Sequence, residues 1–182
     1  MITVQNRALK QLLWVGMGSI SMFFAGLTSA YIVRKGEGNW VEFVLPEWFW
    51  YSTITIVLSS AILILAQQNI KKDKSIFSLV LGVLVLGLLF TFFQFNGWNE
   101  LTSKGIYLTG KGSNVAGSFL YILTLAHLVH LIGGVIALLV TAINAKRKKY
   151  SSENYLGLEI ASIYWHFLSI LWVYLFCFLT YL

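Results

Sequence analysis

Five apolar runs, each long enough to cross a lipid bilayer, constrain this chain more than any other feature. A transmembrane helix needs about 20 predominantly apolar residues. Apolar residues make up 58% of the 182 residues and charged residues only 11%, whereas a soluble domain carries about 25% charged residues. We therefore predict an all-α, polytopic membrane protein that forms one membrane domain, a bundle of five transmembrane helices. The predicted spans are roughly residues 12–33, 48–66, 75–95, 115–143 and 155–182.

The basic residues lie between the spans and predict the orientation of the chain. The N-terminus and the second and fourth loops hold 2 + 3 + 4 = 9 Lys and Arg residues, and the two other loops hold 4. Loops that remain in the cytoplasm carry the excess of Lys and Arg. This asymmetry predicts a cytoplasmic N-terminus and a C-terminus outside. It also accounts for the net charge of +6 without a nucleic-acid partner.

Four ionisable side chains lie deep in apolar sequence: His127, His130, Glu159 and His166. Such groups are costly in hydrocarbon, so they should face protein, a polar lipid group or trapped water. His127 and His130 are three residues apart, so they should share one helical face, and Glu159 and His166, seven apart, should share another.

Three uses of these groups are open from the sequence. Two histidines that point the same way cannot be the two axial ligands of one haem, but with His166 they could hold zinc or copper. The four groups could instead form a proton relay. We favour a structural role, in which they form hydrogen bonds between spans four and five or contact lipid headgroups. Trp165 would then be a packing or interface anchor. The single cysteine supplies neither a disulfide framework nor a thiolate cluster.

Small residues recur along the first span at a spacing of four. Such stripes let helix backbones approach closely, so we predict that this face packs against another helix. The stripes consist of Ser21, Ala25 and Ser29, with Gly26 and Ala30 beside them.

Several motifs, in the same order along the chain, resemble subunit III of the haem–copper respiratory oxidases. The MFFAGL of residues 22–27 is similar to the same run in that family. The HLVH of residues 127–130, followed by two glycines, is similar to its HGLHVxxG run. Glu159, the YWHF of residues 164–167 and Trp172 are similar to its E…YWHFVDVVW run, and Gln94 and Trp98 fit the segment that closes the span before.

The resemblance implies a short, five-helix form of subunit III. The family's longer members have seven spans, with a lipid-filled, V-shaped cleft between the first two and the rest. That cleft should be absent here or closed by another subunit. Ile20 stands where the family has a buried glutamate, and Ser169 where it has an aspartate, so the roles of those two carboxylates should not transfer.

The resemblance also implies function. It predicts a non-catalytic subunit of a bacterial cytochrome c oxidase, in the inner membrane, within a complex that reduces oxygen to water and pumps protons. This chain should have no catalytic, cofactor-binding or metal-binding residue, because haem and copper sit in subunits I and II. It should pack against subunit I, bind structural phospholipid, help sustain proton uptake and enzyme lifetime, and could join a larger respiratory supercomplex.

Two alternatives remain from the sequence. The first, within the family, is the equivalent subunit of a quinol oxidase or a nitric oxide reductase. The second is a stand-alone transporter.

Overall fold

The computed structural model describes residues 2–38, 40–41, 43–110 and 113–181, with side chains from residue 6 onward. The described residues form five α-helices and no strands. Each helix is long and apolar enough to cross a membrane, which confirms the predicted all-α architecture. The helices are α1 (Ile2–Gly36), α2 (Trp48–Ile70), α3 (Phe77–Ser103), α4 (Val115–Lys146) and α5 (Leu156–Tyr181).

Two helices extend well beyond the apolar runs that predicted them. Helix α1 begins at Ile2 rather than near residue 12, and α3 ends at Ser103 rather than near residue 95. Hydropathy falls at these polar segments, but their residues keep the intrahelical hydrogen bonds. A helix can continue into water where no Pro interrupts it, and the single Gly97 in the α3 segment is tolerated.

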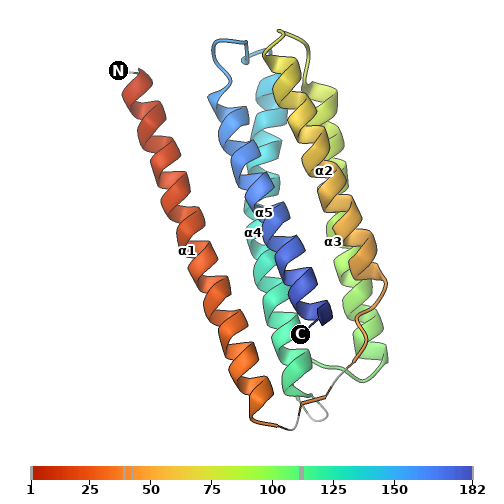
Figure 1. The fold of residues 1–182 in the computed structure, drawn as a ribbon. Helices are drawn as coiled ribbons and strands as arrows, with labels where there is room; N and C mark the ends of the chain where they lie inside the picture. The colour runs from red at the N-terminus through yellow and green to blue at the C-terminus, as the bar shows by residue number, and fades with distance from the viewer. Residues whose placement is uncertain (1, 39, 42, 111–112, 182) are drawn as a thin grey trace.

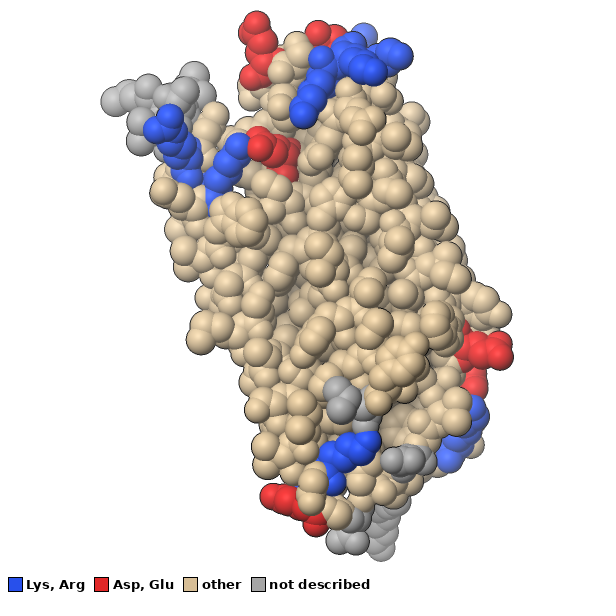
Figure 2. All heavy atoms as spheres, viewed as in Figure 1, with Lys and Arg blue, Asp and Glu red and all other residues tan. Residues whose placement is uncertain are grey.

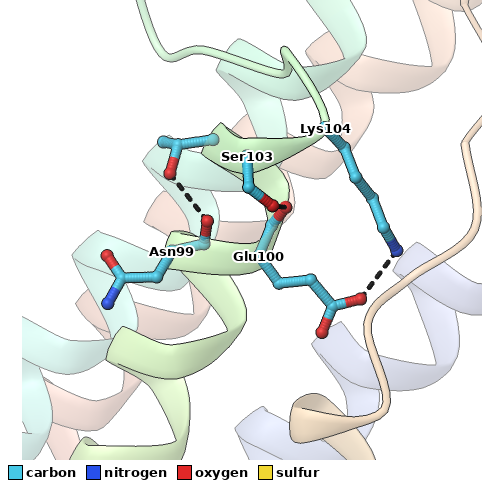
Figure 3. A network of polar contacts seen from close by, with 5 residues as sticks. Asn99, Glu100, Ser103 and Lys104 are labelled. Carbon is cyan, nitrogen blue, oxygen red and sulfur yellow. Dashed lines mark hydrogen bonds and ion pairs between the residues drawn. The ribbon is translucent and has the colours of Figure 1, made fainter.

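Helix α3 ends in a turn that satisfies its last carbonyl groups. Gly105 adopts a φ of +78°. Its N–H bonds the Thr102 carbonyl at 3.1 Å, and the Ile106 N–H bonds that of Leu101 at 3.0 Å, the Schellman pattern. Lys104 adds an ion pair to Glu100 at 2.6 Å (Figure 3). Because this network caps the helix, α3 projects past its apolar run.

Helices α2 to α5 form a four-helix core, and α1 lies outside it (Figure 1). Helix α5 contacts α1, α2 and α4, while α3 contacts α2 and α4. In the described part of the chain, α1 packs only against α4 and α5. Two hydrophobic clusters follow this division: one spans α2 to α5, and a smaller one joins α1 to α4 and α5 around Phe24, Tyr31 and Leu175.

The small-residue stripes of α1 do not pack within this chain. Its inward face carries Met17, Phe24, Thr28 and Tyr31, which recur at helical spacing. The stripe residues are exposed, and no side chain or backbone comes within 4 Å of a Cβ built on Gly26. Within this chain larger side chains fill the α1 interface, and packing of the stripe against another helix stays a prediction.

Uncharged residues cover most of the molecule, and charged residues gather at its two ends (Figure 2). Large apolar side chains such as Leu12, Met22 and Val44 are among the most exposed. An apolar belt between charged ends is the surface that a bilayer requires. The chain is a multi-pass membrane protein.

Candidate functional site

A row of three hydrogen bonds joins α5 to α2 inside the bundle. Trp165 Nε1 donates to Ser59 Oγ at 2.9 Å, and Trp172 Nε1 donates to Thr53 Oγ1 at 2.9 Å. Next to the first of these, His166 Nδ1 shares a hydrogen bond with the Ser60 hydroxyl. Inside a membrane such interhelical bonds each contribute about 0.6 kcal/mol on average. Together with packing, they fix the register of the two helices.

The Trp165 indole is fully buried at the centre of the core. It reaches across to two glycines, Gly87 on α3 and Gly134 on α4. A Cβ on Gly87 would lie 2.8 Å from Trp165 Cη2, and one on Gly134 would lie 3.1 Å from Trp165 Cε3. Trp165, predicted as an anchor, thus contacts α2, α3 and α4 at once, and only glycine leaves room for it.

His127 is also fully buried, but it forms no hydrogen bond with the described residues. Its ring lies 5.9 Å from that of Phe90 on α3 and 5.1 Å from that of Trp172 on α5, measured between centroids. The imidazole is therefore held by aromatic packing.

His130 does not share the surroundings of His127. It is half-buried against α1, with its ring centroid 5.7 Å from that of Phe24. Its Nδ1 hydrogen bonds the carbonyl of Ala126 on its own helix at 2.7 Å. The carbonyl of His130 accepts from Tyr164 OH of α5 at 3.2 Å, so this residue joins α4 to α5 through its backbone. The two histidines, predicted to share a helical face, thus meet different helices, because α1 packs against α4 beside α3 and α5.

Glu159 forms an ion pair with Lys10 of α1, with 2.7 Å between Oε1 and Nζ. Both side chains are about one-third exposed. Sequence reasoning used Lys10 only as an orientation signal and missed this partner. The available signal was that both residues lie near the same end of their spans, but no local pattern says that α1 and α5 are neighbours.

The four predicted groups are thus distributed rather than assembled. Glu159 binds α1 and His166 binds α2, so the expected role of these side chains in joining spans four and five needs correction: their polar contacts lead to other helices. Within the described residues, no three His, Cys, Asp or Glu side chains are placed to hold a metal ion. No hydrogen bond joins any two of the four side chains there.

Other cross-helix hydrogen bonds complete the polar interior. Gln94 Nε2 donates to Ser52 Oγ at 2.9 Å, joining α3 to α2. Trp98 Nε1 donates to Thr124 Oγ1 at 3.0 Å, joining α3 to α4. Sequence reasoning noted Gln94 and Trp98 only as motif residues, because a serine or threonine partner carries no distinctive signal.

The two positions at which the resemblance implies carboxylates, Ile20 and Ser169, form no cross-helix hydrogen bond in the described part of the chain. Ser169 Oγ donates to the carbonyl of Trp165 on its own helix at 2.9 Å. Ile20 packs against the small cluster between α1, α4 and α5. Both residues therefore serve local packing.

Comparisons with known proteins agree with the motifs. A family model described as cytochrome c oxidase subunit III matches residues 45–182, which include α2 to α5. The probable cytochrome c oxidase subunit 3 of Nocardia farcinica is 29% identical over 175 residues, which cover 89% of this chain and 82% of that protein. The cytochrome c oxidase subunit 3 of Thermostichus vulcanus is 27% identical over 87% of this chain and 79% of that protein.

A longer relative matches over a smaller share of its length. The cytochrome c oxidase subunit 3 of Rhipicephalus sanguineus is 30% identical over 128 residues, which cover 69% of this chain but 48% of that protein. The residues matched by the family model include α2 and α5, and therefore the hydrogen bonds between these two helices and the buried Trp165. This chain belongs to the cytochrome c oxidase subunit III family.

Proposed function

We propose that this chain is the non-catalytic subunit III of a bacterial cytochrome c oxidase and associates with the subunits that carry haem and copper. The observation that carries the proposal is the family match across α2 to α5. In this role the chain stabilises subunit I by direct packing, adjoins subunit II and holds structural phospholipid. The electron-transfer and oxygen chemistry belongs to its neighbours.

The bonding of the interior polar groups supports this role. His166 and Trp165 use their ring nitrogens to bind α2. Glu159 is neutralised by Lys10. A transport path would need such groups to contact one another or to line a continuous cavity. Here they act as ties between helices, which suits a scaffold subunit.

Helix α1 supports the proposed contact with a neighbouring subunit. Its small-residue stripe is exposed, and no other helix comes within 4 Å of a Cβ built on Gly26. An apolar groove of about 360 Å³ runs between α1 and α5, lined by Ser21, Ala25, Phe167 and Tyr174 among others. Small residues on an outer face permit close approach of another transmembrane helix. The proposed membrane is the bacterial inner membrane, with the basic end of the bundle in the cytoplasm.

The direct test is purification of the tagged chain from its native membranes in a mild detergent. The expected result is co-migration with a haem-containing subunit and oxygen consumption driven by reduced cytochrome c. If the purified complex oxidises a quinol instead of reduced cytochrome c, the chain is a subunit of a quinol oxidase. Isolation without any haem subunit, together with solute uptake by the chain in liposomes, would refute the proposal.

A pair of variants tests the scaffold role. His166→Leu removes one partner of the α5–α2 bond, and Ser60→Ala removes the other. Both should lower the amount of chain that stays with the haem subunits, while the haem spectrum of the complex that does assemble stays unchanged. A lost haem or copper signal in assembled complex would contradict the role.

A further inference from the structure

The α2–α3 turn and the α4–α5 loop lie side by side at the basic end of the bundle. Asp73 ties them together: its Oδ1 accepts from the Ser152 N–H at 2.8 Å, and its Oδ2 accepts from the Ser152 hydroxyl at 3.0 Å. Asp73 and Lys148 both adopt a positive φ, of 52° and 53°. The two loops thus have a defined shape and a fixed relative position.

A pocket of about 330 Å³ lies between these loops. Its apolar lining includes Ile70 and Tyr150, from the end of α2 and from the α4–α5 loop. Lys74 lines it from one loop and Lys148 from the other. The Asp73 carboxylate lines it as well, with both oxygens accepting hydrogen bonds from Ser152. A group bound here would have an apolar surface on one side and an ammonium group from each loop.

The surroundings of the pocket are strongly positive. Residues 71–74 and 146–153 carry seven cations and two carboxylates, a net charge of 7 − 2 = +5. One of the carboxylates, that of Asp73, is engaged by Ser152. Lys and Arg side chains gather at this end of the molecule (Figure 2). The cations are Lys71, Lys72, Lys74, Lys146, Arg147, Lys148 and Lys149, and the carboxylates are Asp73 and Glu153.

We propose that this pocket binds the phosphate headgroup of an anionic phospholipid. The pocket lies where α2 ends at Ile70 and α4 ends at Lys146, the level at which headgroups meet water. The two lysines bracket the phosphate, and the apolar lining takes the glycerol and the upper acyl carbons. A net charge of +5 favours a headgroup with net negative charge over a zwitterionic one. The inference rests on the proposed function in that it gives a site and a lipid class to the structural phospholipid, and its test uses the isolated chain, so its failure is distinguishable from failure of the oxidase assignment.

The experiment compares two double variants of equal charge in the full chain, purified in an uncharged detergent. Lys74→Gln with Lys148→Gln removes the cations of the pocket. Lys71→Gln with Lys149→Gln removes two cations of the same loops that do not line it. Native mass spectrometry then titrates each protein with phosphatidylglycerol and, as the zwitterionic probe, phosphatidylcholine.

The wild type should bind phosphatidylglycerol more tightly than phosphatidylcholine. The pocket pair should lose about thirty-fold in phosphatidylglycerol affinity, the effect of two lysines near an anionic headgroup, and the control pair about threefold or less. Equal losses in both pairs would overturn the proposal, because they would indicate a diffuse field rather than a site. Equal wild-type affinity for the two lipids would overturn it as well.

A third variant changes the shape of the pocket and keeps every charge. Ala145 lines the pocket, and Ala145→Leu should weaken phosphatidylglycerol binding about as much as the pocket pair does. Unchanged circular dichroism and gel-filtration elution establish that the variants are folded. If the folded Ala145→Leu protein binds phosphatidylglycerol as tightly as the wild type does, the proposal is overturned as well.

Discussion

The contact between Gly87 and Trp165 gives the sharpest test of how this bundle is packed. In a Gly87→Ala protein the new Cβ would lie 2.8 Å from Trp165 Cη2 and 3.3 Å from Cζ2. To restore an ordinary contact of 3.4 Å, the indole would have to move by about 0.6 Å. Trp165 is fully buried, and its Nε1 is held by Ser59 Oγ of α2 at 2.9 Å, so the ring has little room to retreat.

The size of the effect follows from two opposing terms. Overpacking of a tight core costs about 1–3 kcal/mol. Replacing a helical glycine by alanine contributes up to about 1 kcal/mol in the other direction. Gly82 on the same helix has nothing within 4 Å of its Cβ position, so Gly82→Ala has only the favourable term. Gly87→Ala should therefore be about 1–3 kcal/mol less stable than Gly82→Ala.

Unfolding of the purified chain in mixed detergent micelles, followed by circular dichroism, measures this difference. Trp165→Phe supplies the coupling test, because the smaller phenyl ring lacks the outer atoms that the Cβ meets. The Gly87→Ala penalty should shrink in that background. Equal stability of the two alanine variants would refute the packing argument, as would a Gly87→Ala penalty that is undiminished in the Trp165→Phe protein.

Three further perturbations test single contacts by the same unfolding assay. His127→Leu should leave stability unchanged or raise it by about 1 kcal/mol, because the imidazole is buried without a hydrogen-bond partner among the described residues. A loss of stability of similar size would contradict this prediction. Lys10→Glu should lower stability by less than about 1 kcal/mol, because exposed ion pairs contribute little. Adding Glu159→Lys should restore the lost stability, and no recovery in the double variant would count against the Lys10–Glu159 ion pair. Gly97→Ala should destabilise the chain by about 1–3 kcal/mol, because its Cβ would lie 2.6 Å from Phe49 Cε2. A stability equal to that of Gly82→Ala would count against this close contact.

The candidate site could be predicted from the sequence only in part. The buried polar residues were identifiable, because ionisable groups stand out in apolar runs. The hydrogen-bond partners of these residues were not identifiable from the sequence. Ser59, Ser60 and Thr53 accept or share the bonds of α5, yet serine and threonine are common in transmembrane helices and no spacing marks these three. Lys10 was interpreted only as a topology signal, although it neutralises Glu159.

The sequence by itself determined that five helices form and where their apolar centres lie, because the transfer of side chains into lipid is a sum over local residues. The tertiary structure decided which helices are neighbours. His127 and His130 are three residues apart, yet one meets α3 and α5 and the other meets α1. The stripe of small residues on α1, predicted to pack against a helix, is left exposed by the other four helices. A helical pattern specifies a face, but the element that covers this face depends on how all five helices fill space together.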